Sequence, residues 1–299
     1  MRQRSIIAAI TMVLCCAIAA TNLCAQQESQ FIEMMGTSGS INWTSGVIEA
    51  IGIGAPPERF YGKPQARPMA IRAAQMDAYR KLLEVVNGVR VDSMTLVKNY
   101  TVQSDLIRSQ VSGIVKGASI VNTDYLSDGT VEVTVRMPLH GATSLANTIY
   151  PSVFGEKPET KPEKVSAQSV PTPPVPEPQV PTPPEVTANT GLVVDARGIQ
   201  ARPAMSPKII DENGQEVYGA LQVNREIAVQ QGMSGYSRDI TTIKTNPRVT
   251  DDPLICKGLK TDGLGKSNIV IRNADAEQIR ASRGSSEFLK NCRVMIVLD

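Results

Sequence analysis

Histidine is almost absent from this 299-residue chain, which contains only His140. A single imidazole excludes a metal site built from several histidines of one chain, and it leaves one candidate for a histidine-based catalytic triad. Because His140 follows a predicted hairpin and precedes Gly141, we expect it to be a surface or capping residue rather than a general base.

The chain also lacks a large net charge, since it contains 31 Lys and Arg residues and 29 Asp and Glu residues. The net charge of +2 provides no strong positive field, which argues against general nucleic-acid binding.

Several catalytic motifs are missing as well. No cysteine belongs to a C-x-x-C pair, which argues against a dithiol redox catalyst, and no Ser-x-x-Lys spacing occurs. The nearest match to the serine-hydrolase elbow G-x-S-x-G is the run around Ser234, which is one residue short. Aromatic residues make up 4% of the chain and supply few platforms for sugars, although two carboxylates distant in sequence could still form a glycosidase site. We therefore predict no catalytic residues, no cofactor and no metal site.

The N-terminus has the organisation of an export signal. Two arginines precede an uncharged, mostly apolar run over residues 5–20, and small residues close the segment. We predict a signal peptide over residues 1–25, with cleavage after Ala25 or after Ala19, and an N-terminal segment at 26–38. An uncleaved anchor and a lipidated N-terminus are the alternatives; no cysteine follows a good lipobox. We expect the mature protein in the periplasm, with a possible association with the outer membrane.

Export changes what the cysteines imply. Cleavage after Ala25 removes three of the five cysteines and leaves Cys256 and Cys292. An even pair in an oxidising compartment predicts one disulfide, which the chain-entropy model values at about 3–4 kcal/mol. Two buried free thiols are the alternative.

Proline divides the mature chain. Ten of the twenty prolines lie between Glu156 and Thr190, in a stretch without aromatic residues. This composition favours polyproline II and predicts a spacer at 155–190 between a first domain at 39–154 and a second domain at 191–299. The alternative is that the P-x-x-P motifs of this stretch serve as ligands for proline-binding modules. We expect the spacer to hold the second domain at a distance from the first.

The first domain is predicted to be α+β, with a helix packed on an antiparallel sheet. Residues 40–54 are typical of a strand or bent strand pair, in which Gly52 and Gly54 permit bends or close approach. A helix is predicted from Pro68 to Gly88. Its expected core face is the apolar stripe of Met69, Ala73, Met76, Tyr79, Leu83 and Val86.

A second helix and a hairpin complete this domain. Ser104 is the expected N-cap of a short helix. The dipeptide Asp128-Gly129 predicts a hairpin between strands at 119–125 and 130–137, because this pair suits the tight turn of antiparallel strands. In the second strand, Val131, Val133, Val135 and Met137 are expected to face the core.

A family resemblance rests on motifs spread over about 110 residues of this domain. They are Ile41-Asn42-Trp43, Gly52 and Gly54, Ala73-Ala74, Asp77-Ala78-Tyr79-Arg80, Val111-x-Gly113, Val115-x-Gly117-Ala118, Asp128-Gly129 and Val131-x-Val133. In this order they resemble the Lpp-type outer-membrane lipoprotein family and the related N-terminal domain of the flagellar H-ring assembly protein. The resemblance implies a non-enzymatic envelope module associated with the outer membrane or a flagellar basal body, and it transfers no catalytic residue.

The second domain is predicted to be a mixed, β-rich α/β domain. Strands are expected at 192–196, 208–210, 216–218 and 254–259, and the turn between the second and third contains Asn213-Gly214. A strand at 269–271, a helix from Asn273 and a final strand at 293–298 follow. The last two strands are far enough apart in sequence for a parallel β-α-β pairing.

The functional hypothesis combines these observations. We predict a non-enzymatic exported envelope protein that acts as a binding or structural module. Its expected partners are envelope or flagellar basal-body proteins, with the outer membrane or peptidoglycan as further candidates and nucleic acid excluded. A flagellar ring accessory protein is one alternative, and an exported cell-wall hydrolase is the alternative from another class.

Overall fold

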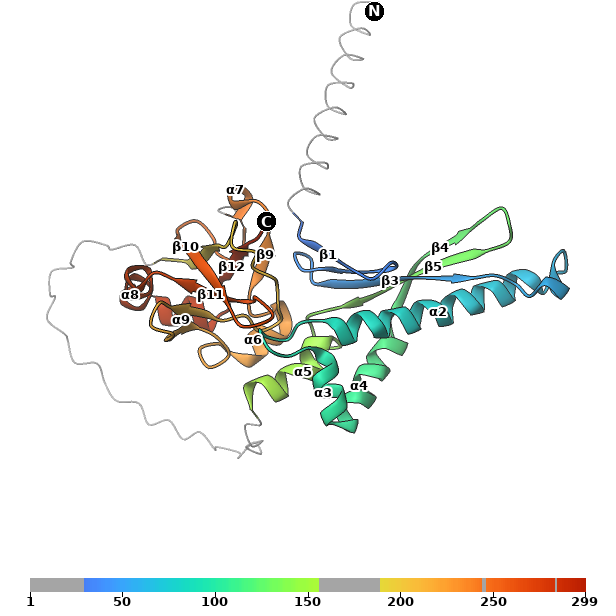
Figure 1. Cartoon of the computed structure of the whole chain (residues 1–299), viewed down its shortest axis with the longest axis horizontal. Helices are drawn as coiled ribbons and strands as arrows, with labels where there is room; N and C mark the ends of the chain where they lie inside the picture. Colours follow the sequence, from blue (N-terminus) through green and yellow to red (C-terminus); the bar gives the residue numbers. More distant parts are fainter. Residues whose placement is uncertain (1–29, 156–188, 244–245, 283) are drawn as a thin grey trace, which may run out of the picture.

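The computed structural model describes residues 30–155 and 189–299, except residues 244–245 and 283. The predicted signal peptide and almost all of the predicted spacer lie outside these residues. The described chain forms two α+β units, each built around its own sheet (Figure 1). Within the described residues, no helix has the length and apolar character needed to cross a membrane.

The first unit is a five-stranded antiparallel sheet with the strand order β1-β2-β3-β5-β4. Its strands are β1 (Ile32–Met35), β2 (Gly39–Asn42), β3 (Val47–Gly54), β4 (Ser119–Tyr125) and β5 (Val131–Pro138). Its helices are η1 (Glu58–Phe60), α2 (Ala66–Gly88), α3 (Val97–Gln103), α4 (Asp105–Lys116) and α5 (Leu145–Phe154). Because β1 pairs with β2, the folded unit begins before residue 39, inside the segment that the sequence separated from it.

Helix α2 lies on the sheet through small residues, and this corrects the predicted core face. The buried residues of α2 are Ala70, Ala74, Ala78, Leu82, Val85 and Val86, whereas Met76 is 69% exposed. A Cβ atom on Gly52 would lie 2.1 Å from the backbone nitrogen of Ala78, so β3 and α2 are in backbone contact. The alanines face the sheet because only small side chains fit there, and most of the predicted stripe of larger residues is only partly covered.

The predicted hairpin is confirmed. Strands β4 and β5 pair antiparallel around the Asp128-Gly129 turn, and the residues of β5 that were expected in the core are buried. The hydroxyl of Ser104 accepts a hydrogen bond from the Ile107 amide at 3.3 Å, as expected for the N-cap of α4. Strand β4 forms an edge of the sheet, and six of its seven residues are exposed.

The second unit is a seven-stranded mixed sheet with the order β8-β7-β11-β10-β6-β12-β9. Its strands are β6 (Gly191–Asp195), β7 (Ile209–Asp211), β8 (Glu216–Tyr218), β9 (Gly235–Ser237), β10 (Pro253–Asp262), β11 (Asn268–Ile271) and β12 (Val294–Val297). Its helices are α6 (Arg225–Gln231), α7 (Ile240–Ile243), α8 (Asn273–Ala281) and α9 (Ser285–Lys290). The α+β class predicted for the whole chain is therefore confirmed.

The strand pairing corrects two expectations for this unit. Strands β11 and β12 are not neighbours, because β12 pairs in parallel with β6 and β9, and β11 lies between β7 and β10. The predicted disulfide is also not formed: Cys256 and Cys292 are buried free thiols. Cys256 lies in β10 and Cys292 just before β12, with β6 between them. The two strands are therefore two strand spacings apart, which is about 9.6 Å. This separation exceeds the limit of about 7 Å between the Cα atoms of two cysteines that form a disulfide.

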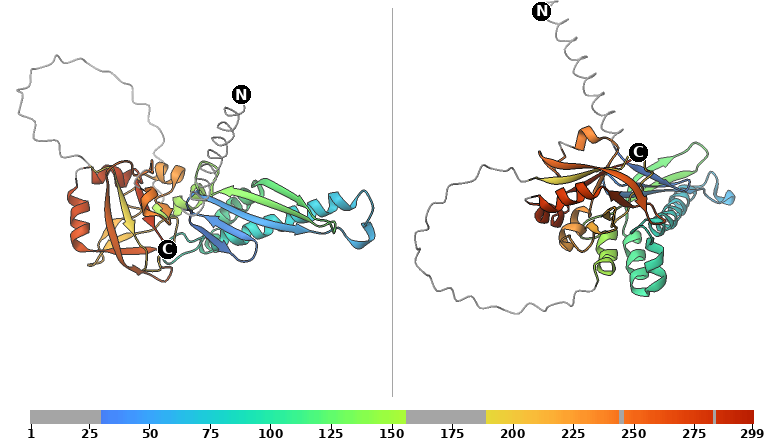
Figure 2. Two further views of the ribbon diagram at one scale, coloured as in Figure 1. Left: turned by 90° about the horizontal axis from the view of Figure 1, so that it is seen from above. Right: turned by 60° about the vertical axis from the view of Figure 1, so that its left-hand side comes forward.

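The two units pack against each other, contrary to the expectation that a spacer holds them apart. Figure 2 shows the first unit as an elongated arm whose inner end meets the compact second unit. A single hydrophobic cluster contains buried residues of both units, among them Trp43, Tyr150, Met205 and Tyr236. Burial of apolar surface therefore joins the units whatever the path of the chain between them.

Candidate functional site at the domain interface

His140 lies between the two units. It follows β5 and is enclosed by one glycine from each unit, because a Cβ atom on Gly46 would lie 3.0 Å from its Cδ2 and one on Gly232 would lie 2.7 Å from its Nε2. The next residue continues the contact, since the Gly141 amide donates to the Val229 carbonyl at 2.7 Å. His140 is therefore half-buried at the contact between the units and not on the free surface where it was expected.

The environment of His140 keeps its ring neutral. Burial, followed by the positive charge of Arg248, lowers the pKa of His140 to about 3. Its Nδ1 atom is buried and has no hydrogen-bond partner among the described residues. A general base requires a pKa close to the working pH and a partner that orients the ring, so His140 lacks both properties.

An aromatic pair also connects the two units near His140. The rings of Trp43 from the first unit and Tyr236 from the second meet edge to face, with centroids 5.7 Å apart and planes at 73°. The Thr44 hydroxyl donates to the Tyr236 carbonyl at 2.7 Å. These contacts hold β9 of the second unit against the β2–β3 turn of the first.

Arg248 is a half-buried cation beside the same contacts. Its guanidinium donates to the carbonyl oxygens of Gly232 at 3.1 Å, Cys292 at 2.9 Å and Gln231. Two of these carbonyls end helix α6, whose negative dipole end favours a cation. Among the described residues no carboxylate pairs with Arg248, and burial lowers its pKa.

These residues line one cavity of about 400 Å³ between the units (Trp43, Thr44, Ser45, Gly46, Val47, Pro138, His140, Gln230, Gln231, Ser234, Gly235, Tyr236, Asn246, Arg248 and Met295). Ser234, the residue of the incomplete hydrolase elbow, is among them. Its hydroxyl is buried and has no hydrogen-bond partner in the described part of the chain. The interdomain pocket thus combines a cation without a carboxylate partner and two unpartnered polar atoms.

A carboxylate network also joins the two units, and Trp43 connects it to the pocket. Glu33 of β1 binds Arg90 at 2.6 Å and Arg202 of the second unit at 3.0 Å, and the Trp43 indole donates to Glu33 at 3.0 Å. Burial would raise the pKa of Glu33, but the hydrogen bonds from Arg90, Trp43 and Arg202 and the charge of Arg90 together lower it. Arg90 also donates to the Pro203 carbonyl at 2.9 Å, so the network spans both units.

Backbone hydrogen bonds join the units next to this network. The amides of Met205 and Ser206 donate to the carbonyls of Arg90 and Val91 at 3.0 and 2.7 Å. Beyond them, the Gly265 amide donates to the Ser93 carbonyl at 2.7 Å. The loop after α2 is therefore held by two separate segments of the second unit.

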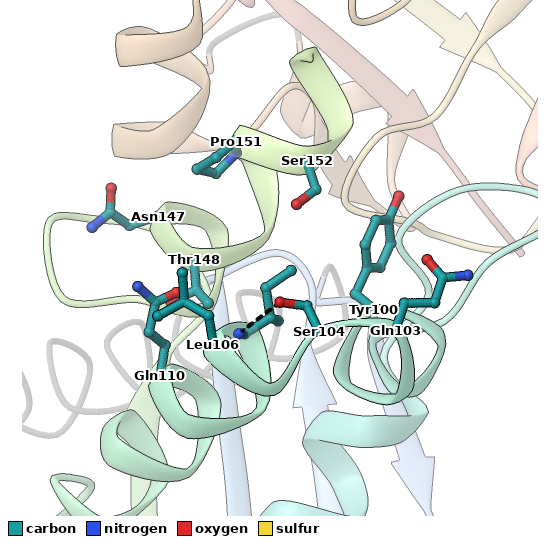
Figure 3. A pocket seen from close by; sticks show the side chains of 10 residues that line it. Tyr100, Gln103, Ser104, Leu106, Gln110, Asn147, Thr148, Pro151 and Ser152 are labelled. Atoms are coloured by element: carbon teal, nitrogen blue, oxygen red, sulfur yellow. Dashed lines mark hydrogen bonds between the residues drawn. The ribbon is translucent and has the colours of Figure 1, made fainter. Parts of the chain in front are cut away.

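Further hollows lie on the first unit, two of them beside helices α3 to α5 and at the far end of the sheet. One, of about 500 Å³, separates α3 and α4 from α5 and is lined by uncharged side chains such as Tyr100, Gln110 and Asn147 (Figure 3). The other, of about 720 Å³, lies at the far tip of the arm, where Arg67 stacks on the Tyr125 ring at 3.8 Å. Neither contains a buried, unpaired polar group, so we take the interdomain pocket as the candidate functional site.

The sequence predicted no residue of this site as functional. It singled out His140 and Ser234 but assigned neither a role, and it gave no reason to consider Arg248. The three residues come from separate parts of the chain, and only the contact between the units brings them together. The two cysteines, the only site residues predicted, lie outside the pocket lining, and burial raises their pKa to about 12 for Cys256 and about 11 for Cys292.

Comparison with known proteins finds a similarity for the second unit. Residues 191–299 match the family model of the second domain of Treponema pallidum Tp0624. Among curated proteins, none matches this chain. The match begins at residue 191 and covers no residue of the first unit.

Proposed function

We propose that this protein is a non-enzymatic exported protein of the cell envelope that acts as a binding or structural module in the periplasm or at the outer membrane. The observation that supports this best is the joint packing of its two units through one hydrophobic cluster and the Glu33 network. Joined in this way, the second unit supports the first unit, whose elongated sheet extends away from it. The export signal predicted at residues 1–25 and the family resemblance of the first unit point to the same compartment.

The exposed edge of that sheet is the surface most suited to a partner. Strand β4 has a neighbour on one side only, and its exposed residues include Ile120, Val121 and Tyr125. Edge strands carry unpaired backbone groups that accept an added strand, and exposed apolar side chains add contact area. Envelope proteins are the proposed partners, and flagellar basal-body proteins are the alternative that the family resemblance favours.

The hydrolase alternative has less support. His140 is the only histidine, and its pKa of about 3 makes it a poor general base at neutral pH. A glycosidase would instead need two carboxylates in one cleft, and in the described part of the chain no Asp or Glu lines the interdomain pocket.

Partner capture from detergent-solubilised envelopes tests the proposal. The mature chain serves as bait beside Val121→Lys, which places a charge on the β4 edge, and Val102→Lys, which places one on the exposed face of α3. We expect Val121→Lys to lose a specific envelope partner that the mature chain and Val102→Lys retain. Recovery of the protein in the cytoplasmic fraction, or equal capture by both variants, would contradict the proposal. Loss of motility on gene deletion would select the flagellar alternative.

A further inference from the structure

The interdomain pocket contains a positive charge whose hydrogen-bond partners among the described residues are all neutral. Arg248 is directed at three backbone carbonyls, which use three of the five guanidinium hydrogens. Two donors remain on a cation that lines a cavity of about 400 Å³. Arg248 is half-buried, so part of the hydration of its charge is lost, and a bound anion would compensate for that loss.

Two further groups of the pocket lack partners. The Ser234 hydroxyl belongs to a residue that is 5% exposed, and neither it nor the His140 Nδ1 has a hydrogen-bond partner among the described residues. Buried polar atoms in native proteins are nearly always satisfied, which makes two such atoms in one cavity a sign of an additional binding partner. Both residues line the pocket that contains Arg248.

From these three groups we propose that the interdomain pocket binds a small carboxylate, held by the free donors of Arg248 and by the Ser234 hydroxyl. A guanidinium edge matches a planar carboxylate, and one cation balances one negative charge. A phosphate dianion would need more positive charge than the pocket supplies, because its histidine is neutral. The indole of Trp43 and the thioether of Met295 form an apolar wall for the rest of the ligand, and the amides of Gln230 and Asn246 suit a peptide group.

The single histidine provides a direct test, because the Cε1 proton of His140 gives the only histidine signal in an NMR spectrum of the mature chain. The probes are N-acetylalanine, a tripeptide with a free C-terminus, N-acetylalaninamide and inorganic phosphate. We expect a saturable shift of the His140 signal with the two carboxylates and no shift with the neutral amide. Tighter binding of N-acetylalanine would indicate a free small molecule as the ligand, and tighter binding of the tripeptide would indicate the C-terminus of a peptide chain.

The absence of a saturable shift with either carboxylate up to about 10 mM would overturn the proposal, since weaker binding is below a useful affinity. An equal response to the amide, or stronger binding of phosphate, would overturn it too. These outcomes are independent of partner capture by β4, so this proposal and the proposed function fail separately.

Variants of two buried serines assign the binding to this pocket. Ser234→Ala is expected to weaken carboxylate binding about tenfold or more, the usual effect of losing a hydrogen bond to a charged group. Ser267 is the matched control, because its hydroxyl is also buried and unpartnered but lies outside the pocket lining. Arg248→Gln is expected to abolish binding, and circular dichroism establishes whether it folds. If Ser234→Ala and Ser267→Ala bind the carboxylate equally well, the site is not the one proposed.

Discussion

Gly232 is the residue on which the contact between His140 and the second unit depends. Its backbone has φ of +83°, a conformation that glycine adopts without strain, and the imidazole fills the space where a side chain would begin. Because glycine has a hydrogen atom in place of a side chain, the second unit can approach the ring this closely. A larger residue would add backbone strain and also displace the ring.

Gly232→Ala is expected to destabilise the protein by about 2–4 kcal/mol, since backbone strain and a steric clash both contribute. Gly214→Ala is the control: Gly214 has φ of +78°, but a Cβ atom there meets nothing within 4 Å, so only the backbone cost of about 1 kcal/mol is expected. Urea unfolding of both variants measures the difference. Equal destabilisation would show that the His140 contact contributes nothing.

The thiols allow a second prediction for single residues. Cys256 and Cys292 lie on separated strands, and burial raises the pKa of both, so native protein is expected to react with iodoacetamide slowly at pH 8. After unfolding, both thiols should react quickly. Mass spectrometry of the unreduced protein checks this, and a mass lower by two hydrogens would reveal the disulfide that the fold does not allow.

At the scale of secondary structure, the close backbone contact between β3 and α2 determines how the first unit packs. Gly52 and Gly54 of the strand face the backbone of α2 at Ala70, Ala74 and Ala78. A helix packed this closely on a sheet has no room for an added methyl group. The same contact explains why the alanines of α2, and not its larger side chains, are buried over the strand.

Gly52→Ala is expected to cost at least about 3 kcal/mol, because its Cβ would lie 2.1 Å from the Ala78 nitrogen and 2.2 Å from the Ala74 oxygen, and backbone atoms cannot move aside cheaply. Gly113→Ala, in the middle of α4, has open space around the new methyl group and should stabilise that helix by up to about 1 kcal/mol. Thermal unfolding followed by circular dichroism compares the two. A neutral Gly52→Ala would contradict this close contact.

At the scale of the whole molecule, the Glu33 network makes the contact between the units sensitive to acid. The pKa of Glu33 is lowered in the folded protein, so its ionised form favours folding. This contribution is fully present above the unfolded pKa of 4.5 and is lost as the pH falls through the folded value. The two units should therefore separate more readily in acid than at neutral pH.

We expect Glu33→Gln to lower the unfolding midpoint at pH 7 and to reduce its dependence on pH below 4.5, because the substituted side chain cannot lose a charge. Glu58→Gln, on the exposed η1 turn, is the control and should leave the unfolding midpoint at pH 7 unchanged. Urea unfolding at pH 7 and at about pH 3.5 measures both variants. If Glu33→Gln kept the pH dependence of the unaltered protein, the Glu33 network would be excluded as the source of that dependence.

Local patterns in the sequence were enough to predict most of the secondary structure. The Asp128-Gly129 hairpin, the Ser104 cap, the end of α2 at Gly88 and the strands at both ends of the second unit follow from turn chemistry, capping and apolar periodicity. Each of these features depends on residues a few positions apart. The α+β class follows from the same local signals.

The tertiary structure alone decided which surfaces meet. The buried face of α2 depends on the glycines of β3, the separation of the two thiols depends on strand order, and the interdomain pocket depends on residues nearly 200 positions apart in sequence, Thr44 and Tyr236. The physical reason is that close packing depends on shape across the contact, which local propensity does not encode. The lone histidine was evident from composition, but its neutral, half-buried state exists only because the second unit packs against it.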